Sequence, residues 1–245
     1  MPATACKWYH TFMKTISVVV PAYNEEKNID RTLATLSEAE RFSKIVCVND
    51  GSRDATEDRI KKFKKVHLIN IAKNKGKGYA LAEGIGRTKS ELVLLLDADL
   101  TTLNKQHIEQ MIDPILHSRE IDVVVGYEYG KFISVFSGQR VYYRKDLLPI
   151  LNELRKSKYG VEVLLNAVFR NKTVKYVQLE DLGHIDKFSK FNKIVWFYNY
   201  FTQWFVMVLG QVIKYGISKE EFKTALEEQG VIISEKFKEY KASRK

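Results

Sequence analysis

The sequence predicts an α/β fold with a mostly parallel, right-handed wound sheet covered by helices. In the first half of the 245-residue chain, apolar β-branched runs typical of buried strands alternate with segments of helical periodicity, and the connections between them are short. Polar clusters directly follow three of the predicted strands: "PAYNEE", "NDGS" and "DADL". Sheets of this kind bind ligands at the carboxyl ends of their strands, so the clusters predict a binding site at one edge.

The first half contains five predicted strands and the helices between them. The strands are residues 15–21, 44–50, 66–71, 91–99 and 121–126. Asn24 is predicted to cap a helix, and glycines precede another helix over residues 76–88. Apolar residues at helical spacing define the buried faces of two helices: Ile29, Leu33 and Leu36 in the first, and Ile108, Met111, Ile112 and Ile115 in the second.

The second half is less regular. We predict a turn and then a helix from near Asp146 within residues 136–148, a helix over 159–171, and a strand running into a loop over 173–184. Residues 194–213 form a window without charge that is rich in aromatic side chains, and charged helices end the chain. We therefore expect an N-terminal extension over residues 1–13, one α/β domain over 14–187 and a helical region over 188–245.

Basic side chains outnumber acidic ones by 40 to 30, which gives a net charge of +10. This surplus indicates an anionic partner: nucleic acid, a phosphorylated metabolite or acidic lipid headgroups. The sequence carries no nucleic-acid-binding signature, so we expect no nucleic acid partner. Two cysteines without a disulfide pattern, and residues 1–12 without the apolar core of a signal peptide, favour a cytoplasmic protein.

Asp97 and Asp99 form the first candidate site. On a regular strand, residues i and i+2 point to the same face, so both carboxylates would converge on one point. Hard oxygen ligands of this kind suit Mg²⁺ or Mn²⁺ bound to a substrate phosphate. The alternative is a polar strand end whose acids cap the following helix, and a single D-x-D triplet does not decide between the two.

The other clusters each have two interpretations when taken singly. Asp50, followed by Gly51, stands either at a ligand site or in a helix-capping turn. The glycines and lysines of "NKGKG" (74–78) suit an anion cradle but lack the P-loop spacing. In "PAYNEE", Tyr23 and Glu25 offer an aromatic face and a carboxylate for a base and a ribose, or belong to an ordinary strand-to-helix connection.

Taken together, these clusters indicate a protein family more specifically than any one of them does. "VVVPAYNEEKNI", "VNDGSRDAT", "NKGKGYAL" and "DADL", in this order and spacing, resemble the family 2 nucleotide-sugar glycosyltransferases over roughly residues 14–185. "FSGQR" and "YGVEVLLN" are similar to acceptor-side segments of polyprenyl- or dolichyl-phosphate sugar synthases and of glucosyl-phosphoglycerate synthases. The resemblance implies a GT-A fold, with a Rossmann-like, mostly parallel mixed sheet flanked by helices, followed here by amphipathic, aromatic helices at the C-terminus.

The resemblance also implies a role for each matching residue. The nucleotide-sugar pocket would contain Pro21, Ala22, Tyr23, Glu25, Asp50, Gly51, Lys77, Asp97 and Ala98. Asp97 and Asp99 would bind Mg²⁺ or Mn²⁺ at the diphosphate, and His184 is either a further metal ligand or a surface-loop histidine. Arg140, together with Arg144, would neutralise the leaving diphosphate.

The implied chemistry is inverting sugar transfer, in which metal and arginines stabilise charge on the departing nucleoside diphosphate. The "GKG" triplet is slightly closer to UDP-glucose-using members than to GDP-mannose-using ones. Glu162 in "YGVEV" is the candidate general base for a hydroxyl acceptor, whereas a phosphate acceptor is already ionised and needs no base. Glu162 is alternatively an acid favoured by the helix dipole at a helix N-terminus.

The window 194–213 bears on the acceptor. Its length suits a bilayer span, its aromatic and polar residues favour a helix lying in the membrane interface, and a core or dimer-interface helix is the third alternative. We expect a peripheral or monotopic enzyme on the cytoplasmic face of a membrane that uses polyprenyl phosphate, with a homodimer through the C-terminal helices as a further expectation. Transfer to a hydroxyl of a soluble phosphorylated acceptor, and nucleotide-sugar binding without turnover, are the alternatives.

Overall fold

The computed structural model describes residues 14–128, 134, 137–157 and 160–183. The chain divides into two compact units, residues 1–185 and 186–245, and all described residues belong to the first. The predicted N-terminal extension, the helical region 188–245 and the aromatic window 194–213 lie outside the described residues. None of the helices within the described ranges has both the length and the apolar character needed to cross a bilayer.

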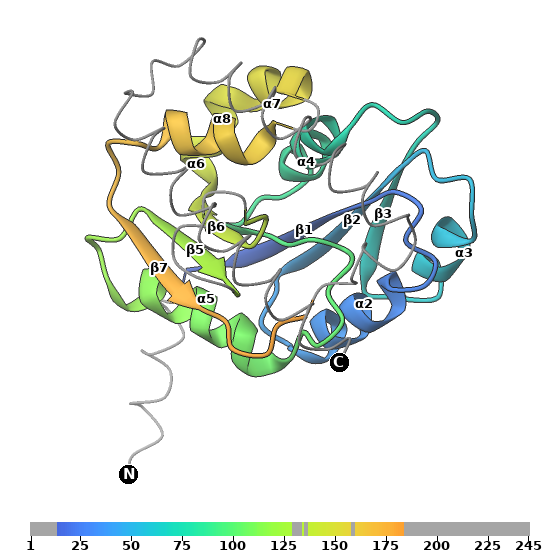
Figure 1. Ribbon diagram of the computed structural model, residues 1–245, viewed down its shortest axis with the longest axis horizontal. Helices are drawn as coiled ribbons and strands as arrows, with labels where there is room; N and C mark the ends of the chain where they lie inside the picture. Colours follow the sequence, from blue (N-terminus) through green and yellow to red (C-terminus); the bar gives the residue numbers. More distant parts are fainter. Residues whose placement is uncertain (1–13, 129–133, 135–136, 158–159, 184–245) are drawn as a thin grey trace, which may run out of the picture. The chain divides into compact units, whose positions relative to one another are not determined.

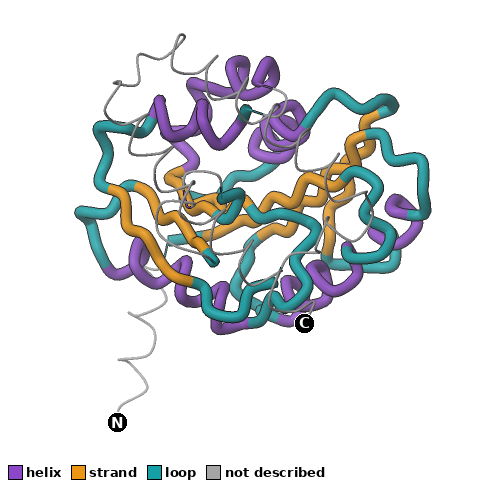
Figure 2. The backbone as a smooth tube through the Cα atoms, viewed as in Figure 1, coloured by secondary structure: helices purple, strands orange, loops and turns teal. Residues whose placement is uncertain are grey.

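A seven-stranded sheet forms the middle layer of the described unit (Figure 2). The strands are β1 (Ile16–Ala22), β2 (Lys44–Asp50), β3 (Val66–Ile71), β4 (Leu92–Leu95), β5 (Val123–Tyr127), β6 (Arg140–Tyr143) and β7 (Val174–Gln178). Their order across the sheet is β3-β2-β1-β4-β6-β5-β7. All neighbours pair in parallel except β6, which is antiparallel to both β4 and β5. The predicted mostly parallel, mixed sheet is therefore confirmed.

Helices cover both faces of the sheet (Figure 1). One face carries α2 (Ile29–Glu38), α3 (Thr56–Ile60) and α5 (Lys105–His117). The other carries α4 (Lys77–Gly86), α6 (Arg144–Leu147), a 3-10 turn, η2 (Leu148–Ile150), α7 (Leu151–Ser157) and α8 (Val161–Val168). This three-layer arrangement follows from parallel strands, because both faces of such a sheet must be covered.

The central strands are buried on both faces, which explains their continuous apolar runs. Val18 and Val20 of β1 belong to the core that the sheet shares with α2 and α5. Val19 points to the opposite face, toward α4. The two predicted helical ridges, from Ile29 to Leu36 and from Ile108 to Ile115, are buried in the α2 and α5 side of this core, as expected.

Strand β4 is shorter than predicted. It ends at Leu95, and the chain turns at Ala98 and Asp99. Asp97 and Asp99 therefore lie beyond the strand, and the expectation that strand geometry aligns their carboxylates is wrong. The turn is fixed from α2, because Thr32 Oγ1 donates to the carbonyl oxygen of Ala98 (3.2 Å).

Strand β6 was not predicted. The sequence predicts a turn and then a helix from near Asp146, whereas residues Arg140–Tyr143 form a strand and α6 begins directly after them. Four residues are too few to show strand periodicity. The strand exists because it pairs on both sides, with β4 and with β5, and these partners are distant in sequence.

Asn24 does not cap a helix as predicted. Helix α2 begins at Ile29 with Asn28 as the preceding residue, and Asn24 has a φ of +56° in the loop after β1. The Asn24 Oδ1 atom accepts a hydrogen bond from the backbone N–H of Arg53 (2.9 Å). The side chain therefore binds the neighbouring loop instead of the helix, and asparagine tolerates this left-handed backbone better than most residues do.

Gly84 and Gly86 of α4 provide a matched pair for testing the helix-to-sheet packing. A Cβ on Gly84 would lie 2.3 Å from Val19 Cγ1, whereas a Cβ on Gly86 would meet nothing within 4 Å. We expect Gly84→Ala to lower the free energy of unfolding by about 1–3 kcal/mol through overpacking. Gly86→Ala should raise it by about 0.5–1 kcal/mol, because alanine is the better helix former. Urea unfolding measures both, and equal effects would contradict the close approach of α4 to β1.

Candidate active site

The loops that follow β1 and β2 are hydrogen-bonded to each other. The backbone N–H of Glu25 donates to Thr56 Oγ1 (2.8 Å). The carboxylate of Asp54 accepts from the backbone N–H of Glu26 (3.2 Å) and from that of Thr56 (3.1 Å). Since β1 and β2 are parallel neighbours, both loops leave the same edge of the sheet. The motifs "PAYNEE" and "NDGSRD" thus form one connected layer at the carboxyl edge.

Asp50 connects the end of β2 to the loop before α4. Its buried carboxylate accepts from the backbone N–H groups of Lys75 (2.9 Å) and Gly76 (2.8 Å). Burial raises the pKa of Asp50, although these hydrogen bonds and the Lys75 charge oppose the shift. The loop predicted to cradle a ligand anion therefore directs these two donors to the protein's own carboxylate. Gly51 has a φ of +71°, and a Cβ there would lie 2.6 Å from Asn74 N, so the turn requires glycine.

The four residues predicted at the end of β1 differ in exposure and contacts. Ala22 is buried, and Pro21 lies past the last residue pair between β1 and β4, where its missing N–H costs no ladder bond. Tyr23 is 40% exposed, so its ring is accessible to a stacking partner. The carboxylate of Glu25 accepts from Asn28 Nδ2 (2.7 Å), which holds it at the start of α2.

Lys77 joins the "DADL" motif to helix α8. It is the first residue of α4, and its ammonium lies 2.6 Å from Asp97 Oδ1 and 2.7 Å from Glu162 Oε1. The three side chains are 26%, 21% and 13% exposed, respectively. Burial by itself would lower the pKa of Lys77, but the two carboxylates outweigh burial and hold this pKa above its ordinary value. Glu162 is therefore more than a helix N-terminal acid, because it forms a partly buried ion pair with Lys77.

Gln139 and Gly138, for which the sequence predicted no role, contact Asp97 from another side. Gln139 Nε2 donates to Asp97 Oδ2 (3.3 Å), and Gln139 Oε1 accepts from Ser137 Oγ (2.6 Å). The backbone at Gly138 runs against the same carboxylate, since a Cβ there would lie 2.3 Å from Asp97 Oδ2. All belong to "FSGQR", so the motif contained the signal, although the resemblance singles out only Arg140 from it.

Arg140 is buried inside the protein, with an exposure of 2%. Its Nε donates to Ser137 O (2.6 Å), and its Nη1 donates to Asn166 Oδ1 (2.7 Å). Asn166 follows Glu162 by four residues on α8, so both lie on the same face of that helix. On these contacts Arg140 anchors the helix face that carries Glu162. Its expected role at a leaving diphosphate stays a prediction.

Arg144 is at the opposite edge of the sheet. It follows β6, which runs antiparallel to β4 and brings it beside the amino end of β4. Its backbone N–H donates to Glu91 O (2.8 Å), and its Nε donates to Thr88 Oγ1 (3.1 Å). The structure therefore does not bring Arg144 together with Asp97, in contrast to the expectation from the resemblance.

The predicted metal ligands are partly described. Asp99 is half-buried in the turn after β4, whereas His184 lies outside the described residues. Within the described ranges, no group of three His, Cys, Asp or Glu side chains gathers as a metal site. Mg²⁺ at substrate phosphates needs only one or two carboxylates, because waters and phosphate oxygens supply the other ligands. The Lys77 ammonium lies 2.6 Å from Asp97 Oδ1, where a cation is attracted, so Asp97 fits such a site.

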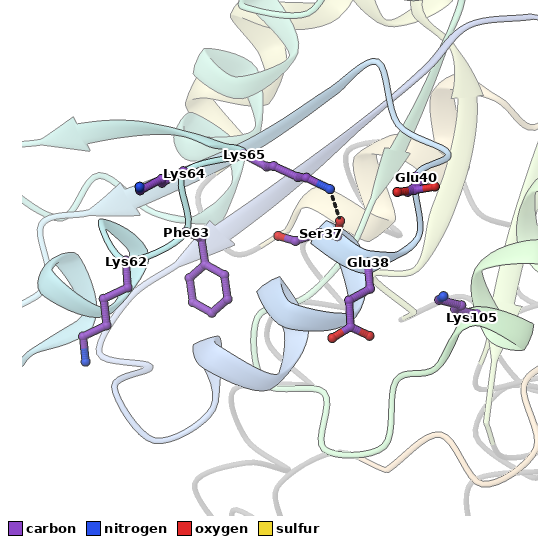
Figure 3. Close-up of a pocket in the computed structure, with 8 residues that line it drawn as sticks. All are labelled: Ser37, Glu38, Glu40, Lys62, Phe63, Lys64, Lys65 and Lys105. Carbon is purple, nitrogen blue, oxygen red and sulfur yellow. Dashed lines mark hydrogen bonds between the residues drawn. The ribbon is translucent and has the colours of Figure 1, made fainter.

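A surface hollow of about 660 Å³ is formed by other parts of the fold (Figure 3). Its lining residues are Ser37, Glu38, Glu40, Lys62, Phe63, Lys64, Lys65 and Lys105. None of the predicted site residues is among them, and Lys65 Nζ donates to Ser37 O across the hollow (3.0 Å). The carboxyl edge of the sheet therefore remains the candidate site.

Comparison with known proteins agrees with this assignment. The model of the family "Glycosyl transferase family 2" matches residues 17–210. The chain belongs to this family. The matched range includes every strand of the sheet except the first residue of β1, and it includes Lys77, Asp97 and Glu162. The prediction of a family 2 glycosyltransferase is confirmed.

Several known proteins are similar to part of the chain. A dolichyl-phosphate beta-glucosyltransferase of Trichomonas vaginalis is 37% identical over 126 residues, which is 45% of this chain and 39% of that protein. Human dolichyl-phosphate beta-glucosyltransferase is 36% identical over 104 residues, 36% of this chain and 32% of the human protein. Poly-beta-1,6-N-acetyl-D-glucosamine synthase of Staphylococcus epidermidis is 34% identical over 121 residues, 48% of this chain and 29% of that protein. The alignments therefore span well under half of these relatives.

Solved structures support the fold. Glucosyl-3-phosphoglycerate synthase from Mycobacterium tuberculosis, in complex with Mn²⁺, uridine diphosphate and glucosyl-3-phosphoglycerate, has a TM-score of 0.66 at 21% identity. This match covers 84% of the present chain and 81% of the other. The same enzyme with Mn²⁺, UDP-glucose and phosphoglyceric acid has a TM-score of 0.61 at 23% identity, covering 71% and 72%. The predicted GT-A fold is confirmed by these matches.

Asp54 makes the stability of the connected loops depend on pH. Burial acts to raise its pKa, but hydrogen bonds from Thr56 and from the Glu26 N–H outweigh burial and hold the pKa below its ordinary value. An acid with a depressed pKa stabilises the fold above its unfolded pKa, near 4, and this stabilisation is lost as the pH falls. We expect Asp54→Asn to lower the free energy of unfolding by about 1 kcal/mol at neutral pH. The difference from the wild type should shrink below about pH 4.

Urea unfolding between neutral pH and about pH 3 measures this difference. Asp58→Asn on α3, the helix that follows Asp54, is the control, because this side chain is 80% exposed and should change little. A difference between Asp54→Asn and the wild type that grows toward acid pH would contradict the assignment.

Proposed function

We propose that this protein transfers a sugar, with inversion, from a nucleotide-sugar donor to a polyprenyl-phosphate carrier at a membrane surface. The observation that carries the proposal is the contact of the Lys77 ammonium with both Asp97, in the donor-side motif, and Glu162, on the acceptor-side helix. The reacting atoms of donor and acceptor must approach to about 3–3.5 Å. Lys77 contacts a carboxylate on each side, so the two sides of the site lie next to each other.

The donor side follows from the carboxyl edge of the sheet. The exposed ring of Tyr23 is suited to stacking on the nucleotide base. Asp50 and Gly51 are proposed to belong to the same nucleotide pocket. Asp97 and Asp99 hold Mg²⁺ or Mn²⁺, which supplies positive charge to the departing diphosphate when bound. His184 is proposed as a further ligand. UDP-glucose is the favoured donor, in keeping with the "GKG" triplet and with the glucosyl in the names of two relatives.

The acceptor side rests on different observations. Two of the similar proteins carry dolichyl phosphate in their names. The uncharged, aromatic window 194–213 suits the lipid interface, and the net charge of +10 favours an anionic membrane surface. A phosphate oxygen of the carrier attacks the anomeric carbon from the side opposite the leaving diphosphate. We accordingly propose a peripheral or monotopic protein on the cytoplasmic face, with the C-terminal region, predicted from the sequence to be helical, as its membrane contact.

A second function remains a candidate because of Glu162. This carboxylate lies at the junction with Asp97 and Lys77, where a general base for a hydroxyl acceptor would stand. The acceptor would then be a hydroxyl of a small phosphorylated molecule, as the name glucosyl-3-phosphoglycerate synthase indicates for the solved structures. The sugar would leave the enzyme on a soluble product instead of a lipid.

Transfer assays with a donor panel test the proposed function. UDP-glucose, GDP-mannose and other nucleotide sugars are each offered with polyprenyl phosphate in vesicles or with 3-phosphoglycerate, in the presence and absence of Mn²⁺. We expect Mn²⁺-dependent formation of a polyprenyl-phosphate sugar, and we expect Asp99→Ala to abolish it while the far-ultraviolet circular dichroism stays unchanged. Full activity of Asp99→Ala would overturn the metal assignment, and product only on 3-phosphoglycerate would overturn the lipid acceptor.

Glu162→Gln separates the two acceptors by mechanism. With an ionised phosphate acceptor no base is required, so we expect the variant to lose less than about tenfold in kcat. A hydroxyl acceptor loses its base, and kcat should fall by about 10²–10⁴-fold together with the basic limb of the pH profile. Glu83→Gln, which breaks the ion pair with Arg155 between α4 and α7, is the control for structural loss.

A further inference from the structure

The ammonium of Lys77 stands between two carboxylates that belong to different parts of the fold. It lies 2.6 Å from Asp97 Oδ1 and 2.7 Å from Glu162 Oε1. These distances are those of charge-assisted hydrogen bonds, and the ammonium has three N–H donors with which to make them. The Lys77 ammonium is therefore a positive charge of the protein itself, bound to Asp97, the carboxylate that is expected to bind the metal.

The position of the ammonium is determined by packing. Lys77 is the first residue of α4, and the next residue, Gly78, is in contact with α7: a Cβ there would lie 2.2 Å from Leu154 O and from Ser157 Oγ. A side chain at Gly78 would push α7 away from α4. The glycine thus allows α7 and the following α8 to come close enough for Glu162 to reach Lys77.

The position of the Asp97 carboxylate is also fixed by its neighbours. Gln139 Nε2 donates to its Oδ2, and the backbone of Gly138 leaves no room for the carboxylate to shift toward β6. Asp97 therefore meets the ammonium in one fixed orientation. A Mg²⁺ ion that coordinates Asp97 Oδ1 must approach within about 2.0–2.1 Å of this oxygen. The ammonium lies 2.6 Å from the same oxygen, so the two cations cannot both occupy this side of Asp97 without repulsion.

Resting on the proposed function, we infer that Lys77 competes with the divalent cation for Asp97 and so makes metal binding depend on the nucleotide. Two like charges at coordination distance from one oxygen repel each other strongly in a partly buried site. The diphosphate of the donor offers the ammonium another anionic partner, and its oxygens complete the ligand set of the metal. Lys77 is therefore a positioning residue: its ammonium stays paired with Asp97 and with Glu162 until the donor binds.

Mn²⁺ binding by the full-length protein in the absence of nucleotide tests the inference. Titration followed by electron paramagnetic resonance of free Mn²⁺ compares the wild type with Lys77→Met. We expect the variant to bind Mn²⁺ roughly tenfold more tightly, because a repelling unit charge is removed from the coordination sphere. Adding Asp97→Asn to Lys77→Met should return the affinity to the wild-type level or below.

Arg155→Met is the matched control. Arg155 of α7 pairs with Glu83 of α4 (3.0 Å). The variant therefore also removes one positive charge and one contact between these two helices, but not a contact with Asp97. We expect its Mn²⁺ affinity to stay within about twofold of the wild type, since salt and water screen a charge whose described contacts are with Glu83 and Asn152 and not with Asp97. If Lys77→Met does not fold by circular dichroism, Lys77→Gln provides the same comparison.

Unchanged or weaker Mn²⁺ binding by Lys77→Met or Lys77→Gln would overturn the inference, as would an equal gain in Arg155→Met. Since the titration contains neither donor nor acceptor, its outcome is independent of the transfer assays. Transfer to polyprenyl phosphate combined with unchanged Mn²⁺ binding would leave the proposed function intact and remove only the role of Lys77. Tighter Mn²⁺ binding by the variant without transfer to the lipid would support the role of Lys77 and overturn the proposed lipid acceptor.

Discussion

The ion pairs of Lys77 with Asp97 and Glu162 are the interaction on which the arrangement of the site depends. Two carboxylates that are mostly withdrawn from water need a nearby cation, since their like charges would otherwise repel each other. Only the first residue of α4 reaches both of them among the described contacts. The close packing of α7 on α4 at Gly78 then follows as a requirement, because any larger residue would separate the partners.

The remaining loops at the carboxyl edge are held by the protein's own hydrogen bonds. The Asp50 carboxylate accepts hydrogen bonds from two backbone N–H groups of the loop before α4. Asp54 does the same for the loops after β1 and β2. Such contacts order the binding edge before a ligand arrives, which reduces the entropy lost on binding. Acidic residues that look alike in the sequence thus serve the scaffold in some positions and face the site in others.

Much of the fold could be predicted from local patterns. The five strands of the first half and the buried ridges of α2 and α5 were recognisable because strands and helices have different apolar periods. β6 could not be predicted, because four residues show no period and its stability comes from β4 and β5 on either side. The end of β4 at Leu95 was missed for a related reason, since the turn is held by Thr32 of α2.

The candidate site was predictable in its residue types but only partly in its contacts. Asp97, Lys77 and Glu162 were all named from motifs, yet nothing in the sequence says that one lysine contacts both acids. Arg140 was expected at a diphosphate and is found buried against Asn166. Arg144 was expected beside it, but an antiparallel strand carries it to the other edge. The direction of β6 decided where Arg144 lies, and this direction depends on strand pairing, which a short motif does not encode.

By itself the sequence determined the family, the sheet-and-helix alternation and the polar clusters at strand ends. These properties are local, because each depends on residue types within a few positions of one another. The tertiary structure alone decided which acid pairs with which base, which carboxylates are consumed by backbone N–H groups, and at which edge Arg144 lies. Those outcomes depend on distances between segments far apart in the chain, and only the packing of α4, α7 and α8 over the sheet sets these distances.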